Sequence, residues 1–110
     1  MIVGVIGSRS ICDFRDFNLE IPIGTSKIVS GGANGVDTLS KSYALSNNIP
    51  FLEILPNYQA FGKSAPFIRN DEIISTCDFI LAIWDGKSKG TKYVINKCIE
   101  NSKPIKVLIY

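Results

Sequence analysis

At 110 residues, the chain is long enough for one domain with its own core and too short for two. Its 12 basic and 10 acidic residues leave a net charge of +2, and the lysines are scattered, which argues against a strongly basic surface for duplex DNA. The absence of histidine excludes histidine acid–base catalysis and most zinc sites. We therefore expect no metal site.

The apolar runs are far shorter than the roughly 20 residues of a membrane-spanning helix. The first run, residues 2–6, is too short and too uncharged for a signal peptide. We expect a cytoplasmic protein without membrane contact. Cys12, Cys77 and Cys98 contain no CxxC pair, so we expect Cys77 and Cys98 to be small buried residues.

Five short apolar runs predict strands at about 2–6, 27–30, 50–55, 78–84 and 105–109. Most are rich in Ile, Val and Leu with little alternation, which is typical of strands covered on both faces. The segments between them predict a short helix and a loop over 12–24 and helices over about 35–48, from about 64, and over about 91–101. Strand–helix alternation predicts βαβ units. The expected fold is therefore a single Rossmann-like α/β domain over 1–110, a three-layer sandwich with a mainly parallel five-stranded sheet.

Helical spacing also predicts which side chains are buried. In the helix over 35–48, Asp37 is expected to pair with Lys41, while one face buries Val36, Leu39 and Tyr43. The helix from about 64 is expected to bury Phe67, Ile73 and Ile74. The helix over 91–101 is expected to bury a stripe of Val94, Ile95, Cys98 and Ile99.

The stretch from Ser30 to Asp37, with the sequence SGGANGVD, is the strongest functional signal in the chain. Three glycines stand where a strand turns into a helix, and glycine lets a ligand approach the backbone closely. Because a helix N-terminus carries free N–H groups and a partial positive charge, such a turn suits a phosphate. The alternative is a tight turn with no ligand, in which Asn34 caps the helix and Asp37 stabilises its first turn.

Two further turns follow predicted strands, and the carboxyl ends of parallel strands meet at one edge of the sheet. The first runs from Gly7 through Ser8 and Arg9 to Ser10. It offers two hydroxyls and the Arg9 guanidinium, which can hold phosphate in two hydrogen bonds. The other runs from Trp84 and Asp85 to Gly90 and Thr91. Trp84 is either a core residue or a base-stacking platform, and Asp85 either a ligand contact or a turn former. Because neither GxGxxG nor GxxxxGK[ST] is present, NAD-dependent redox chemistry and ATPase activity are disfavoured, and no cofactor is expected.

These motifs, in this order along nearly the whole chain, resemble the YspA-like (cpYpsA-related) family of the SLOG superfamily. The carrying residues are GSR at 7–9, SGGANGVD at 30–37, YQAFGKSA at 58–65, Arg69-Asn70 and Gly90-Thr91. The resemblance implies a Rossmann-like fold and a site for nucleotide-derived ligands, and it makes Arg69 and Asn70 site candidates. The expected ligand-binding set is Gly7, Ser8, Arg9, Ser30, Gly31, Gly32, Ala33, Asn34, Gly35, Asp37, Arg69, Asn70, Trp84, Asp85, Gly90 and Thr91.

The superfamily includes phosphoribohydrolases of the Lonely Guy type, DNA-processing proteins and sensors of signalling nucleotides. The hydrolases carry PGGxGTxxE, but Val94 stands here where that motif has its glutamate. The favoured prediction is thus a non-catalytic sensor, carrier or sponge for a phosphorylated nucleotide derivative, such as an ADP-ribose-like or cyclic species. The alternatives are an N-glycosidic hydrolase with Asp37 or Asp85 as the working carboxylate and, least favoured, a single-stranded nucleic-acid module. We expect a homo-oligomer, because the predicted sheet leaves open edges.

Overall fold

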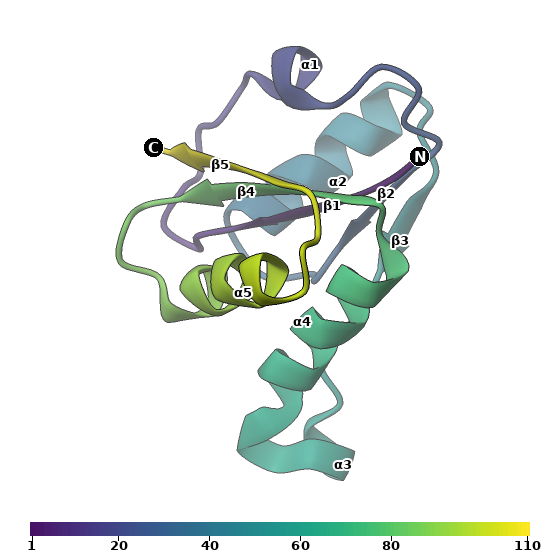
Figure 1. Ribbon diagram of the computed structural model, residues 1–110. Coiled ribbons are helices and arrows are strands. Elements are labelled where there is room, and N and C mark those ends of the chain that lie inside the picture. The colour runs from purple at the N-terminus through teal and green to yellow at the C-terminus, as the bar shows by residue number, and fades with distance from the viewer.

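The strands pair in parallel in the spatial order β3-β2-β1-β4-β5 (Figure 1). This computed structural model describes residues 1–110. The strands are β1 (Ile2–Gly7), β2 (Lys27–Ser30), β3 (Phe51–Glu53), β4 (Phe79–Trp84) and β5 (Ile105–Ile109). The helices are α1 (Phe17–Glu20), α2 (Val36–Ser46), α3 (Tyr58–Phe61), α4 (Ala65–Thr76) and α5 (Lys89–Glu100), with a 3₁₀ turn at Gly62–Ser64.

The sheet lies between two helical layers, so the predicted Rossmann-like three-layer sandwich is confirmed (Figure 1). Because side chains alternate along a strand, Val3 and Val5 of β1 pack toward α1 and α2, whereas Ile6 packs toward α4 and α5. The connection reverses at β1, whose neighbours are β2 on one side and β4 on the other. In such open sheets the crevice outside the strand ends at this reversal is the usual ligand site.

The two outer strands differ from the expectation of burial on both faces. β3 covers three residues instead of 50–55 and pairs only with β2, and β5 also leaves most of its side chains at least partly exposed. The reason is their position at the two edges of the sheet, where helices cover them incompletely. The segment 12–24 contains the short helix α1 followed by a loop, as predicted.

The helix boundaries agree with the predicted ranges to within a few residues. α5 begins two residues earlier than predicted, at Lys89, because the Ser88 hydroxyl caps it by accepting the Thr91 N–H at 3.4 Å. The helix α3 and the 3₁₀ turn after it were not predicted. Asn57 caps α3 by accepting the Ala60 N–H at 3.1 Å.

Most of the predicted buried residues belong to the core, including Val36, Ile73, Val94 and both Cys77 and Cys98. Two predictions of burial were wrong: Phe67 is 42% exposed and Ile99 is 67% exposed, because the layer beneath each helix covers a narrower stripe than the sequence pattern indicates. The predicted Asp37–Lys41 pair is also absent, since Lys41 instead lies 3.9 Å from Glu53 on β3.

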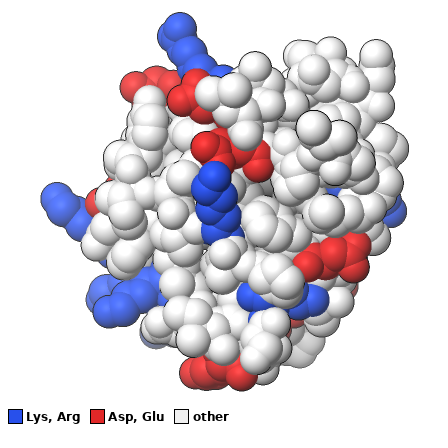
Figure 2. All heavy atoms as spheres, turned by 45° about the horizontal axis from the view of Figure 1, so that its top comes forward, with Lys and Arg blue, Asp and Glu red and all other residues white.

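Charged side chains of both signs are interspersed on the face shown in Figure 2, without a large area of one sign. No helix of the structure has the length and apolar character needed to cross a lipid bilayer.

Candidate functional site

A cleft of about 450 Å³ lies at the carboxyl ends of the central strands. The turns after β1, β2 and β4 contribute to it, and so do α4 and the first turn of α5. Its lining residues are Ile6, Gly7, Arg9, Ser10, Gly31, Ala33, Asp37, Pro66, Phe67, Arg69, Asn70, Ile73, Asp85, Ser88, Gly90 and Thr91. The volume falls in the range of about 300–1,000 Å³ that is common for small-molecule sites.

Ser8 joins the turn after β1 to the turn after β4. Its N–H donates to the Ile83 carbonyl at 3.0 Å, and its hydroxyl accepts the Asp85 N–H at 2.9 Å. The side chain is fully buried. Ser8 therefore fixes the relative position of the two turns without lining the cleft. The next two residues, Arg9 and Ser10, do line it.

The glycines of the turn after β2 have separate roles. Gly31 lines the cleft, and an added Cβ there would lie 2.6 Å from the Arg69 guanidinium. Gly35 instead lies against the turn after β1, where an added Cβ would lie 2.5 Å from the Ser8 carbonyl oxygen. Close packing within the protein, and not contact with a ligand, thus explains Gly35. Gly32 also has a positive φ of 76° and lies outside the cleft lining.

Asn34, which the ligand-free alternative placed at the N-cap of the helix, does not cap it. Gly35 is the N-cap residue of α2 and has φ 78°, so no side chain caps this helix in the usual way. The first turn of α2 holds the loop instead: Asp37 Oδ2 accepts the Ala33 N–H at 3.1 Å, and the Thr38 hydroxyl donates to the Ala33 carbonyl at 3.0 Å. Asp37 therefore fixes the turn after β2 from its helix side.

Asp37 is 6% exposed, and its second carboxylate oxygen, Oδ1, is buried without a hydrogen-bond partner. The nearby Ser30 hydroxyl is engaged, because it donates to the Val5 carbonyl at 2.7 Å. Burial raises the pKa of Asp37 above its usual value, although the Ala33 N–H and the positive charge of Arg69 oppose the rise. Asp37 lines the cleft as a residue, whereas Oδ1 itself is enclosed by protein.

Arg69 and Asn70, which only the family resemblance indicated, both line the cleft. Arg69 lies across the turn after β2, with Nη1 donating to the Gly31 carbonyl and Nε donating to Asn70 Oδ1 at 2.8 Å. Burial lowers the pKa of Arg69, Asp37 opposes this effect, and the positive charge of Arg9 lowers the pKa further. Arg9 and Arg69 line the same cleft, so an anion bound there would be attracted by both positive charges.

In the turn after β4, Asp85 has a structural role. Its Oδ1 accepts the N–H groups of Lys87 and Ser88, both at 2.8 Å, and its Oδ2 accepts the Ser10 hydroxyl at 2.7 Å. The Ser10 bond and the two backbone bonds lower the pKa of Asp85. A carboxylate that is held ionised by these donors is a weak base, so Asp37 is the better candidate for proton transfer.

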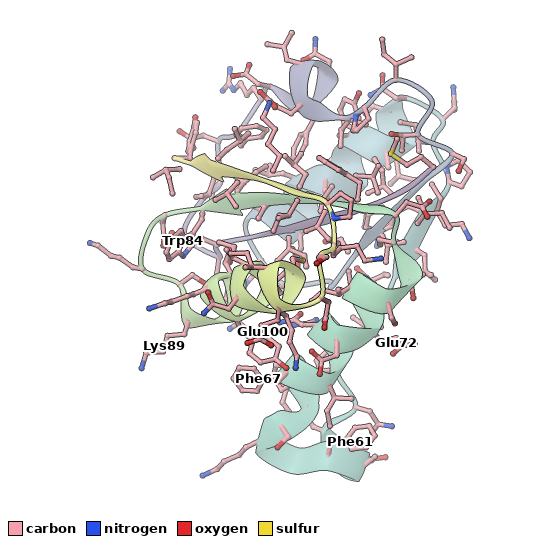
Figure 3. The ribbon with its side chains drawn as sticks, viewed as in Figure 1. Phe61, Phe67, Glu72, Trp84, Lys89 and Glu100 are labelled. Carbon is pink, nitrogen blue, oxygen red and sulfur yellow. The ribbon has the colours of Figure 1, made fainter.

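Trp84 lies at the end of β4 (Figure 3) and outside the cleft lining. Its Nε1 donates to the Ser88 carbonyl at 3.0 Å. Because Ser88 caps α5, the hydrogen bond from Trp84 stabilises the start of that helix. The sequence left open whether Trp84 is a core residue or a stacking platform, and this contact favours the structural role.

The first turn of α5 presents its N-terminus to the cleft through Gly90 and Thr91. A helix start carries N–H groups without helical acceptors and a partial positive charge, both of which favour an anion. The backbone around Gly90 does not require glycine, because its φ is not positive and an added Cβ would meet open space. That space adjoins the cleft.

We expect Gly90→Ala to increase the free energy of unfolding by about 0.5–1 kcal/mol, because alanine is the better helix former and nothing obstructs its methyl group. Urea denaturation measures the change. Gly62→Ala is the matched control: its added Cβ would also meet open space, but its φ of 55° makes alanine unfavourable there. A loss of stability in Gly90→Ala would show that the backbone at Gly90 is not helical or that the space beside it is not open.

The structure therefore brings residues of all three predicted turns to one cleft but leaves several candidates outside its lining. Those outside are Ser8, Ser30, Gly32, Asn34, Gly35 and Trp84. Sequence reasoning did not select the lining residues Ile6, Ser10, Pro66, Phe67, Ile73 and Ser88. For Ser10 and Ser88 the signal was their place in the predicted turns. For Phe67 there was none, since an aromatic residue in a helix is usually a core residue. No cluster of three or more Cys, Asp or Glu side chains is arranged to hold a metal ion.

The fold and the cleft together define a Rossmann-like α/β protein with a polar cleft at the reversal point of its sheet. No protein-family model and no curated protein matches the chain. Among solved structures, the chain is similar to the X-ray structure of DNA processing protein A (DprA) from Streptococcus pneumoniae, with a TM-score of 0.74 and 20% sequence identity. The match covers 96% of this chain and 49% of that chain, so this chain spans about half the length of DprA. The similarity shows the Rossmann-like fold that the SLOG resemblance implies, while membership of the YspA-like family stays a prediction.

Proposed function

We propose that the protein binds a phosphorylated, nucleotide-derived small molecule in the cleft between the turn after β2, α4 and the start of α5. The observation that carries the proposal is the convergence of Arg9, Arg69 and the N-terminus of α5 on one cleft that Asp37 also lines. The cationic groups suit phosphate. The buried carboxylate suits a hydroxyl or amine donor on the same ligand.

The expected binding mode follows from these positions. Phosphate oxygens accept hydrogen bonds from Arg9, from the unused N–H groups of Arg69 and from the first turn of α5. The Asp37 carboxylate accepts a hydrogen bond from a ribose hydroxyl. A sensor, carrier or sponge needs only this affinity and no turnover.

Arg9→Ala tests the proposal, because Arg9 is exposed at the cleft and the substitution removes no contact that the fold needs. We expect the affinity for AMP or ADP-ribose to fall by roughly tenfold to a hundredfold, which corresponds to a charge-assisted hydrogen bond of about 1.5–3 kcal/mol. Titration calorimetry measures the affinity, and native mass spectrometry of the wild type with nucleotides, ADP-ribose and cyclic nucleotides identifies the ligand.

Arg15→Ala is the matched control, since Arg15 is exposed in the same connection after β1 but lies outside the cleft lining. The affinity of the Arg15→Ala protein for each phosphate compound should equal that of the wild type. Equal affinities of all three proteins for every bound phosphate compound would refute the proposed role of the cleft in phosphate binding.

A phosphoribohydrolase is the second candidate, and Asp37 is the observation that favours it. Burial raises the pKa of the Asp37 carboxyl, which makes it a better general base than an ordinary carboxylate, and such groups are concentrated at catalytic sites. Incubation with AMP followed by chromatography separates the two functions. Release of free adenine supports hydrolysis, and recovery of intact AMP supports binding alone.

Single-stranded nucleic acid is the third candidate. The sequence disfavours it because the net charge is only +2, while the similarity in fold to a DNA processing protein favours it. A single-stranded oligonucleotide therefore belongs in the same titration. Nucleic-acid binding would weaken steeply with salt, because binding releases counterions from the phosphates.

We also propose that the protein forms a homo-oligomer. Large apolar side chains are exposed on the segment around α3, including Leu55, Tyr58 and Phe61, and on the free edge strand β5, including Ile109. Exposed apolar surface and an open strand edge favour self-association. The mass that native mass spectrometry records for the ligand-free protein tests this proposal.

A further inference from the structure

Phe67 is an exposed aromatic side chain that lines the cleft, although the helical pattern places it in the core. It belongs to α4 and is 42% exposed. It lies one helical turn before Asn70, which also lines the cleft, so both side chains are presented on neighbouring parts of the same helix face. Figure 3 shows Phe67 extending from α4 toward α5, whereas Phe61 lies at the far end of the α3 segment.

The orientation of the Phe67 ring is supported from α5. The Phe67 and Tyr93 rings meet edge to face, with centroids 4.9 Å apart and an interplanar angle of 68°. The Tyr93 hydroxyl donates to Asp71 Oδ1 at 2.8 Å, which ties this tyrosine back to α4. The Tyr93 ring therefore supports Phe67 from α5, while Phe67 remains 42% exposed and lines the cleft.

The cleft thus combines an apolar aromatic surface with the cationic groups Arg9 and Arg69. A ligand that uses both needs a flat aromatic group joined to a phosphate. Inorganic phosphate, pyrophosphate and sugar phosphates would use only the cationic part. Because every nucleobase offers a π-face, an aromatic platform favours bases without demanding one particular base.

We propose that Phe67 stacks on the base of the ligand, so that the cleft selects nucleotides and their derivatives over sugar phosphates. This inference rests on the proposed function, because it assigns the base-binding part of the same cleft. The sequence suggested Trp84 as one possible base-stacking platform. The proposal assigns this role to Phe67 instead, because the Trp84 indole donates a hydrogen bond to the Ser88 carbonyl at the start of α5.

The test compares AMP and ADP-ribose with ribose 5-phosphate, which lacks the base, by titration calorimetry on the full chain. We expect the wild type to prefer the two base-containing compounds by at least tenfold. Phe67→Leu should weaken their binding by roughly tenfold to a hundredfold and leave ribose 5-phosphate unchanged, as expected from stacking on an aromatic ring. Phe67→Tyr retains the ring and should retain the preference.

Phe61→Leu is the matched control, since Phe61 is also exposed, at 48%, but lies outside the cleft lining. It should bind all three compounds as the wild type does. Undiminished preference in Phe67→Leu, or equal binding of AMP and ribose 5-phosphate by the wild type, would overturn the stacking role and leave phosphate binding in place. Failure of the wild type to bind any of the three compounds would overturn both proposals.

Discussion

Gly35→Ala is expected to lower the free energy of unfolding by about 3 kcal/mol or more, and the melting temperature by roughly 10 °C or more. Two effects add. Gly35 has φ 78° and ψ −127°, a conformation that side-chain-bearing residues rarely adopt. An added Cβ would also lie 2.5 Å from the Ser8 carbonyl oxygen and 2.6 Å from that of Arg9, so the backbone itself must move.

Gly24→Ala separates these two effects. Gly24 has φ 89°, but an added Cβ would meet nothing within 4 Å, so only the backbone conformation is penalised, at about 1–2 kcal/mol. The difference between the two variants in urea denaturation measures the close approach of the turns after β1 and β2. If both variants lose the same stability, the two turns are not packed as described.

Asp37→Asn is expected to change stability and ligand binding in opposite directions. The raised pKa of Asp37 means that the folded protein resists ionisation of this carboxyl more than the unfolded chain does. The wild type should therefore lose stability as pH rises from the ordinary value of 3.8 to the raised pKa, with a slope of up to about 1.4 kcal/mol per pH unit. The introduced amide does not ionise, so the variant lacks this loss and should be the more stable protein at pH 7.

Urea denaturation of both proteins between pH 3 and pH 8 measures this difference, which should be smallest at the acid end. At pH 7 the affinity of the variant for AMP or ADP-ribose should fall by roughly tenfold, because a charged acceptor inside the cleft is lost. Any release of adenine should also disappear. A variant that is less stable than the wild type at pH 7 and equally good at binding would show that Asp37 is a structural residue alone.

Much of the architecture could be predicted because it depends on local patterns. The apolar runs predicted five strands, and their separation by helical segments of ordinary length predicted parallel pairing with crossovers. The edge strands were the exception. Whether a strand such as β3 is covered on both faces depends on its place in the sheet, and the composition of the strand does not reveal that place.

The candidate site, like the fold, could be predicted only in part. Glycines after predicted strands indicated three turns, and these turns adjoin one cleft. Their individual roles followed from contacts between segments far apart in the chain: Gly35 against Ser8, and Arg69 across Gly31. The predicted Asp37–Lys41 pair was wrong for this reason, and Asn34 does not have the capping role that the ligand-free alternative gave it. The chain entering α2 has a positive φ at Gly35, and Lys41 has an acidic partner on β3 that no local rule supplies.

By itself, the sequence determined the order of the strands and of the helices other than α3, the positions of the glycine turns and the absence of histidine chemistry. Each of these is a property of neighbouring residues or of composition. The tertiary structure alone decided which side chains face the cleft. The packing of α4 against α5 leaves Phe67 exposed in the cleft beside Asn70. Burial beneath the turn after β2 leaves one carboxylate oxygen of Asp37 without a hydrogen-bond partner. Exposure and hydrogen-bond satisfaction depend on the whole fold, and these two residues therefore acquire their proposed roles only there.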